Sequence, residues 1–293
     1  MHEGRLTLLT SLFEVYNANE LDSTSHLLAE YFIKNYDHLS DLGIYDVMGA
    51  CYCSRSAVRR FCQSIGFDNF SEVRDMAFEW GVFRHYFLSA DRQLGPGFDL
   101  RGELDRLFES IDRRTAAGDL DALVRGIHDA RSTTLFSADP SANELKEFQR
   151  AMAVEHCVIP LVTESVPAAQ AIRTLGEKDL LVAVSTSGAF VERQRGQLEA
   201  TSALRVIVTA NPGAEVCSLF DQVIAIGDEL GRNNPLHRMY STYGVAYLFD
   251  QVFSRYVQAY DPELGAGGVA GAASAAGDAS GAAAGAIGPG GAA

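Results

Sequence analysis

Short apolar runs alternate with helical patterns through the second half of the chain, and this alternation limits the folds open to it. The helical patterns cover residues 104–116, 120–130, 144–153 and 239–260. The apolar runs are Thr133–Ser137, Cys157–Val162, Leu180–Val184, Leu204–Val208 and Gln222–Ile226. Short apolar strands separated by helices predict a parallel sheet with helices on both faces.

The first part of the chain has only helical periodicity. Helices are predicted over residues 26–35, 44–51, 54–67 and 71–83, the last with Ser71 as its cap, and Gly95–Gly97 marks a break. The fold class is therefore α + α/β, an all-α domain followed by a doubly wound parallel sheet. We place the first domain at residues 1–87, a linker at 88–99 and the second domain at 100–262. Residues 263–293 are almost entirely Gly and Ala, which bury too little surface to offset the entropy of ordering, so a disordered tail is predicted.

The predicted helix Ser54–Phe67 has two contrasting faces. Ser54 can cap its first turn and Gly66 can end it. Val58, Phe61, Cys62 and Ile65 form one apolar face. The opposite face has no acidic residue and carries Ser56, Arg59, Arg60 and Gln63, with Arg55 at its flank. A cationic face with many hydrogen-bond donors fits a helix that lies in the major groove of DNA.

The overall charge opposes broad affinity for nucleic acid. The chain has 24 Lys and Arg against 38 Asp and Glu, a net charge of -14, whereas residues 44–67 hold three arginines and one acid. DNA binding would therefore depend on a few residues. We expect Arg55, Ser56 and Arg59 to reach base edges or adjoining phosphates, with Arg60 and Gln63 on the DNA backbone and Ser54 at the helix start.

Membrane, metal and cofactor sites are not expected. Apolar runs are too short to span a bilayer and the N-terminus lacks a secretion signal, so the expected location is cytoplasmic. The chain has 5 cysteines, an odd number that favours free thiols. Cys51, Cys53 and Cys62 match no common zinc spacing.

The segment Val184–Glu192 is the second candidate site. A strand that ends in Ser185, Ser187 and Gly188 before a helix offers hydroxyls, free amides and the positive end of a helix dipole, which together can hold an anion. The alternative is purely structural, because Ser/Gly turns cap many helices.

The two sites together resemble the RpiR family of bacterial transcription regulators, which join a helix-turn-helix to a sugar isomerase (SIS) domain. In the first part, the matching positions are Leu28–Tyr31, Asn35, Ser54, Val58, Arg60–Cys62, Ile65–Phe67 and Phe70–Val73. In the second part, Asp179, Ser185, Ser187, Gly188 and Glu192 match, and Ser141 keeps the serine of the first loop. The resemblance implies that Ser141, Ser185, Ser187, Gly188 and Glu192 bind an effector. It also implies a DNA operator as partner and a homodimer or tetramer associated through the SIS domains.

Three positions depart from the family pattern. Tyr52 replaces a glycine in the turn of the helix-turn-helix, which costs on the order of 1 kcal/mol if φ is positive there. The first SIS loop reads Ser137–Ser141 without its glycines and with Asp139, which repels a phosphate. Phe190 replaces a threonine in the second loop. The effector is accordingly a phosphosugar, a less anionic ligand, or absent.

The predicted function is a transcriptional regulator of sugar metabolism genes. An SIS isomerase is one alternative, but it needs a placed base, and His128, His156 and His237 are scattered in the sequence. Glu192 is the only acid in the matching loop. The other alternative is an interaction protein that no longer binds DNA. We expect no catalytic activity.

Overall fold

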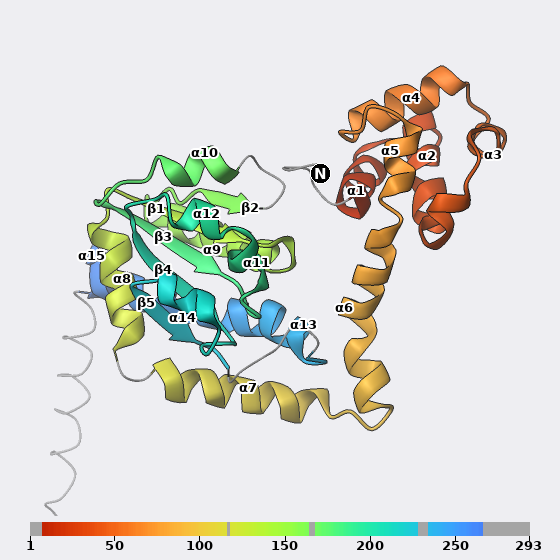
Figure 1. The fold of residues 1–293 in the computed structure, drawn as a ribbon. Coiled ribbons are helices and arrows are strands. Elements are labelled where there is room, and N and C mark those ends of the chain that lie inside the picture. The colour runs from red at the N-terminus through yellow and green to blue at the C-terminus, as the bar shows by residue number, and fades with distance from the viewer. Residues whose placement is uncertain (1–7, 116–117, 164–167, 228–233, 266–293) are drawn as a thin grey trace, which may run out of the picture.

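The computed structural model describes residues 8–115, 118–163, 168–227 and 234–265, which form two domains joined by helix α6 (Phe78–Leu94) (Figure 1). Each domain has its own hydrophobic core. In the described ranges, no helix combines the length and hydrophobicity needed to cross a membrane. The predicted disordered tail lies outside the described residues from 266 onward, and Pro262–Gly265 forms the short helix α15.

The first domain is helical, as predicted. Its elements are α1 (Leu8–Ala18), α2 (Thr24–Lys34), the 3-10 helix η1 (Tyr36–Asp41), α3 (Ile44–Ala50), α4 (Arg55–Ser64) and α5 (Phe70–Asp75). Helix α1 was not predicted, although its Leu8 and Leu12 are fully buried in the core. Val58, Phe61 and Cys62 of α4 enter the same core, which confirms the predicted apolar face.

The single helix predicted over 71–83 is wrong. Asn69, two residues before the predicted cap, accepts hydrogen bonds from the backbone N–H groups of Ser71 and Glu72 and starts α5. Helix α5 ends at Asp75, and α6 begins at Phe78 and runs to Leu94, where Gly95 takes a φ of 75°. The first half of the predicted linker 88–99 is therefore helical, and the predicted boundary at 87 falls inside α6.

Helix α6 is fixed to both domains. Near its start, Glu79 is buried and its Oε2 accepts hydrogen bonds from the Tyr36 hydroxyl at 2.6 Å and the Leu8 amide at 3.1 Å. Burial and this carboxylate raise the pKa of Tyr36. At its middle, the Tyr86 hydroxyl lies 2.9 Å from the Ser241 hydroxyl of the second domain. Glu79 and Tyr86 are seven residues apart, so about 10 Å of one helix joins the two domains.

The second domain is a five-stranded parallel sheet in the order β2-β1-β3-β4-β5. The strands are β1 (Ser132–Ser137), β2 (Leu161–Thr163), β3 (Asp179–Val184), β4 (Leu204–Thr209) and β5 (Gln222–Ala225). The helical elements are α7 (Leu100–Thr115), α8 (Asp119–Asp129), α9 (Asp139–Val154), α10 (Ala168–Arg173), α11 (Ala189–Arg193), α12 (Arg195–Leu198), η2 (Glu215–Leu219), α13 (His237–Met239), the π-helical turn η3 (Tyr240–Gly244) and α14 (Val245–Tyr260).

Both faces of this sheet are covered by helices, which confirms the predicted doubly wound arrangement (Figure 1). On β3, Leu180, Val182 and Val184 pack toward α7, α8, α9 and α14. The alternate residues Leu181 and Ala183 pack toward α10, α11 and α12. This two-residue alternation between two buried faces explains why the strands read as unbroken apolar runs.

Several element bounds in the second domain differ from the sequence prediction, among them the start of α7 at Leu100 instead of residue 104. Strand β2 starts at Leu161 rather than Cys157, because Pro160 precedes it and supplies only a carbonyl, which accepts from the Leu135 amide. Helix α9 starts at Asp139, five residues earlier than predicted, with a proline in its first turn. The closing helix is interrupted by the π-helical turn η3.

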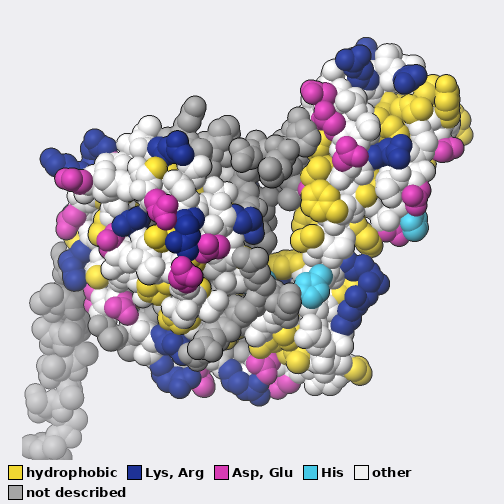
Figure 2. Space-filling view, in the orientation of Figure 1, with side chains coloured by type: hydrophobic (Ala, Val, Ile, Leu, Met, Phe, Trp, Pro, Cys, Tyr) yellow, Lys and Arg dark blue, Asp and Glu magenta, His cyan; other side chains and the backbone are white. Residues whose placement is uncertain are grey.

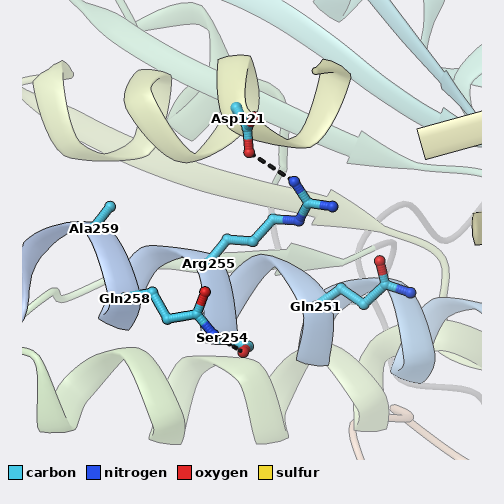
Figure 3. A pocket seen from close by; sticks show the side chains of 6 residues that line it. All are labelled: Asp121, Gln251, Ser254, Arg255, Gln258 and Ala259. Carbon is cyan, nitrogen blue, oxygen red and sulfur yellow. Dashed lines mark hydrogen bonds and ion pairs between the residues drawn. The ribbon is translucent and has the colours of Figure 1, made fainter. Parts of the chain in front are cut away.

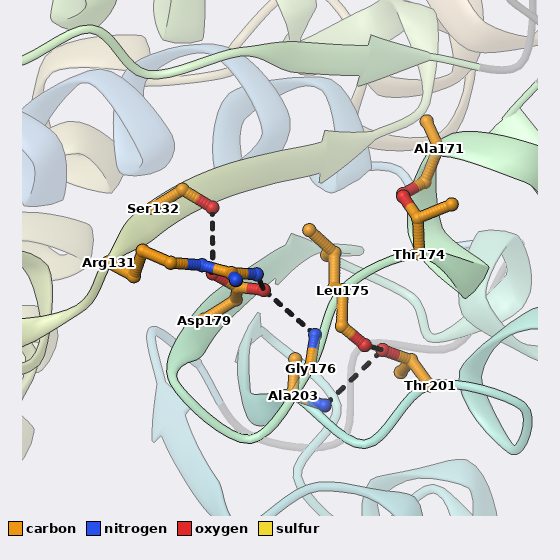
Figure 4. A network of polar contacts seen from close by, with 9 residues as sticks. All are labelled: Arg131, Ser132, Ala171, Thr174, Leu175, Gly176, Asp179, Thr201 and Ala203. Atoms are coloured by element: carbon orange, nitrogen blue, oxygen red, sulfur yellow. Dashed lines mark hydrogen bonds and ion pairs between the residues drawn. The ribbon is translucent and has the colours of Figure 1, made fainter.

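Asp179 anchors the start of β3 (Figure 4). Its side chain is fully buried and accepts hydrogen bonds from Arg131, Ser132 and the Gly176 amide. These contacts, led by the Arg131 hydrogen bond, lower the pKa of Asp179 to about 2. The carboxylate therefore holds the amino ends of β1 and β3 together. The candidate loop follows the carboxyl end of β3, at the other end of the strand.

Candidate functional site

All six predicted DNA-binding residues are exposed to solvent. One of them is the N-cap of α4, and the other five lie along the helix. Ser54 is the N-cap, and its Oγ accepts a hydrogen bond from the Ala57 amide at 3.2 Å. Gly66 takes a φ of 87° just after the helix, as its predicted role as a stop requires. The six exposed residues are Ser54, Arg55, Ser56, Arg59, Arg60 and Gln63.

The guanidinium groups on this face are available to a ligand. Within the described ranges, Arg55, Arg59 and Arg60 form no ion pair. A groove of about 820 Å³ runs beside α4, and its lining includes Arg55, Arg59 and Arg74. Figure 2 shows Lys and Arg side chains over the outer end of the first domain, beside a gathering of hydrophobic side chains near α3. The arrangement can contact phosphate oxygens with several cations at once.

Arg74 was not among the predicted site residues. It comes from α5, and its Nε donates a hydrogen bond to the carbonyl of Ser40 at 3.0 Å. Only the pairing of α4 with α5 brings Arg74 to the wall of the groove. No signal in the sequence beyond its charge could have placed it there.

Tyr52 has the left-handed backbone conformation that we considered for it from the sequence. Its φ is 48°, and its side chain is 95% exposed. The amide of Cys53 donates to the carbonyl of Met48 across this residue, which is the backbone arrangement in which a helix commonly ends on glycine. The turn between α3 and α4 therefore places a tyrosine in a backbone conformation that favours glycine.

The candidate ligand loop lies where the order of the sheet reverses. The chain passes from β1 to the edge strand β2 and then returns to β3 on the other side of β1. Ser137 at the end of β1 is in register with Val184 at the end of β3, and the Ser137 hydroxyl donates to the Val184 carbonyl at 3.3 Å. The loops that begin after these two strands thus start side by side, at the point where open α/β sheets bind ligands.

Ser185, Ser187 and Gly188 form a tight turn after β3. The Gly188 amide donates to the Ser185 carbonyl at 3.1 Å. Gly188 has a φ of 79°, and an added Cβ would lie 3.2 Å from the Cβ of Ala214, so this position requires glycine. Ser185 and Ser141 are buried, and Ser187 is half-buried.

Two parts of the predicted anion site differ from expectation. The predicted helix after the loop, α11, has only 5 residues, so its dipole is weaker than that of a helix of several turns. Glu192 is exposed, and its two carboxylate oxygens each accept a hydrogen bond from Arg195 at 3.1 Å. This ion pair makes Glu192 part of a surface network instead of a free group at the loop.

Thr186 connects the loop to α6, which the sequence did not indicate. Its Oγ1 lies 2.7 Å from the Nε2 of His237. The His237 ring packs edge-on against the Tyr86 ring of α6, with centroids 6.0 Å apart. Burial, with a smaller effect of His85, lowers the pKa of His237, so the ring is neutral at neutral pH. In the sequence these residues lie far apart, and only the fold brings them together.

Other polar features give no second site. A hollow of about 550 Å³ between α8 and α14 contains Arg255, whose Nη1 donates to Asp121 at 2.7 Å, so its charge is already paired (Figure 3). In the described ranges, no group of three or more His, Cys, Asp or Glu is placed to hold a metal. The three cysteines near α4 are free, and burial raises the pKa of Cys51 to about 11 and of Cys62 to about 12.

Comparison with known proteins finds a family match within the first domain. Residues 15–81 match the family model of the helix-turn-helix domain, rpiR family. A search of curated protein sequences found no match.

Several solved structures resemble the chain at low identity. The Vibrio vulnificus NanR protein, in complex with ManNAc-6P, is 17% identical, with 88% of this chain and 93% of that chain covered and a TM-score of 0.44. The sugar isomerase domain of an RpiR transcription factor from Sphaerobacter thermophilus is 12% identical, with 56% and 91% covered and a TM-score of 0.45. A Methanococcus jannaschii protein with an inferred function of 3-hexulose-6-phosphate isomerase is 14% identical, with 54% and 89% covered and a TM-score of 0.44.

Proposed function

We propose that this chain, whose N-terminal domain is a helix-turn-helix domain of the rpiR family, is a DNA-binding transcriptional regulator that responds to a small sugar-derived ligand. The observation that carries the proposal is the exposed, unpaired arginine face of α4 within that domain. Three exposed arginines with no acidic residue on the same face suit contact with DNA phosphates. Arg55, Ser56 and Arg59 are the residues we assign to base edges or adjoining phosphates, and Arg60 and Gln63 to the backbone.

The ligand site that we propose is the pair of loops at the reversal point of the sheet. Ser141, Ser185 and Ser187 offer hydroxyl groups there, which suits the hydroxyls and phosphate of a sugar phosphate. Because the first loop lacks its glycines and Glu192 is held by Arg195, we expect weaker phosphate binding than a glycine-rich loop provides.

The contact from Thr186 through His237 to Tyr86 gives the ligand a route to the DNA-binding domain. A ligand that hydrogen-bonds the loop changes the position of Thr186, and His237 touches both this residue and α6. Since α6 is also fixed to the first domain through Glu79, a shift of α6 changes how the domain is presented to DNA. Coupling of this kind requires that ligand and DNA favour different positions of α6.

The DNA-binding test is fluorescence anisotropy with the DNA upstream of the protein's own coding region. We expect saturable binding that competitor DNA of unrelated sequence does not abolish, and a loss of at least tenfold in affinity for Arg59→Ala with Arg60→Ala. Unchanged affinity of this double variant would refute the assignment of α4. Arg101→Ala is the control, because this exposed arginine lies on α7.

The ligand test is a thermal-shift screen of sugar phosphates that begins with ManNAc-6P and includes hexulose and pentose phosphates. We expect stabilisation by at least one compound and its loss in Ser185→Ala. Turnover of any of these compounds would instead support the isomerase alternative. Stabilisation by none of them at millimolar concentration would refute the sugar-phosphate proposal while leaving DNA binding untouched.

A further inference from the structure

Helix α6 carries an exposed stripe whose first residue, Trp80, packs edge-on against Tyr36 of the first domain, with ring centroids 6.2 Å apart. Residues three, four and seven apart fall on one side of a helix. The hydrogen bonds to the two domains come from Glu79, Tyr86 and Ser89, which lie on a different side of the helix. The stripe, called here the α6 stripe, consists of Trp80, Arg84, Phe87, Leu88, Asp91 and Leu94.

The apolar members of the α6 stripe are unusually open to solvent. Phe87 is 51% exposed, Leu94 is 42% exposed, and Trp80 and Leu88 are 38% and 37% exposed. Single exposed apolar side chains are normal on a protein surface, but four along one helix face form a continuous patch that favours a partner. The Phe87 ring packs against the Phe83 and Tyr86 rings of the same helix, with ring centroids 6.4 and 5.1 Å away.

The charged members of the stripe are arranged symmetrically about its centre. Arg84 precedes Phe87 by three residues, and Asp91 follows Leu88 by three. Both are exposed, and in the described part of the chain neither forms an ion pair. Opposite charges at these two positions make the stripe complementary to itself, whereas like charges would repel each other in an antiparallel pair.

We propose that the α6 stripe binds the α6 stripe of a second copy of this chain, with the two helices antiparallel. A two-fold axis between Phe87 and Leu88 places Arg84 opposite the partner's Asp91, and the symmetry repeats the pair on the other side. Phe87 then meets the partner's Leu88, so the apolar centre is covered and both charges of each chain are paired. No other orientation of two such helices pairs both charges twice. The inference does not depend on DNA binding, since it concerns a surface outside α4.

The test exploits this symmetry through two charge reversals, Arg84→Asp and Asp91→Arg. Each variant alone brings like charges together twice, and we expect its self-association to weaken about tenfold or more in sedimentation equilibrium of the full chain at tens of micromolar. A mixture of the two variants restores opposite charges at both contacts, so it should associate as strongly as the wild type. The double variant Arg84→Asp with Asp91→Arg should also recover the wild-type association.

A capture experiment separates this surface from any other interface. Tagged Arg84→Asp protein should recover untagged Asp91→Arg protein in several-fold excess over untagged Arg84→Asp protein. Equal recovery of the two, or single reversals that associate like the wild type, would overturn the proposal. Thermal unfolding of each variant checks the fold, which we expect to be unchanged because both side chains are exposed and unpaired within one chain.

Discussion

The response of DNA binding to salt follows from the number of arginines around α4 that form no ion pair within the described residues. Each cation that neutralises a phosphate steepens the plot of log K against log salt concentration by about 0.9. If Arg55, Arg59, Arg60 and Arg74 all act on the DNA, the slope is about −3.6 per protomer, and a rise from about 50 to about 200 mM salt weakens binding about 150-fold. Replacing Arg59 and Arg60 by alanine should reduce the slope to about −1.8 and the loss to about twelvefold.

The assay is fluorescence anisotropy of the labelled upstream DNA at four salt concentrations for the wild type and the double variant. Arg101→Ala removes one arginine from α7 and should leave the slope unchanged, so it controls for the change in net charge. The reasoning is refuted if the double variant loses affinity equally at every salt concentration. Such a result would mean that Arg59 and Arg60 support the fold of the domain and do not meet phosphates.

Three further predictions concern stability and coupling. Asp179→Asn should lower the free energy of unfolding by about 1–2 kcal/mol at pH 7, given the pKa of about 2 against an ordinary 3.8 and the partial screening of exposed Arg131. Because the pKa is depressed in the folded state, this contribution is complete above about pH 4 and disappears as the pH falls through about 2, so urea unfolding at pH 7 and pH 2 should show a difference only at pH 7. Tyr52→Gly should raise the free energy of unfolding by up to about 1 kcal/mol, since relief of the left-handed strain exceeds the entropy that glycine adds to the unfolded chain, and a lower value in urea unfolding would contradict this. Thr186→Val should preserve ligand stabilisation in the thermal-shift assay but reduce the ligand's effect on DNA affinity, because the hydrogen bond to His237 is lost; an unchanged effect would exclude this route.

The sequence predicted those parts of the fold that depend on periodicity and local chemistry. The buried strand β3 was predicted to within one residue, because every position of it is apolar except Asp179 at its start. The α4 cap and stop were also right, since Ser54 and Gly66 act through their own backbone neighbours. In each case the forces that set the structure operate within a few residues.

What the sequence could not predict depends on contacts between distant segments. Helix α6 continues past Phe83, the predicted end of the helix, to Leu94. Its packing against α13 and Ser241 stabilises these additional turns, which periodicity did not predict. The approach of Thr186 to His237 joins residues 51 positions apart. The ion pair between Glu192 and Arg195 could have been predicted from the sequence, because the two residues are three positions apart. That this ion pair removes Glu192 from the ligand loop became visible only in the structure.

Helix α6 contacts the DNA-binding domain, the region of the ligand loop and, in our proposal, a second copy of the chain. Each of these contacts uses a different face of the helix. The face with Glu79 holds the first domain, and the face with Tyr86 touches His237 behind the ligand loop. The α6 stripe occupies a third face. If two copies pair through this stripe, α6 sets the distance between the two α4 helices. The same helix contacts His237, which is hydrogen-bonded to Thr186. A small rotation of α6 is then expected to act twice, once in each protomer, on the spacing of the two reading helices. Weakening the stripe by Arg84→Asp should therefore reduce DNA affinity on a two-site operator while leaving affinity for a single half-site unchanged. Equal losses on both DNAs would show that the stripe does not set this spacing.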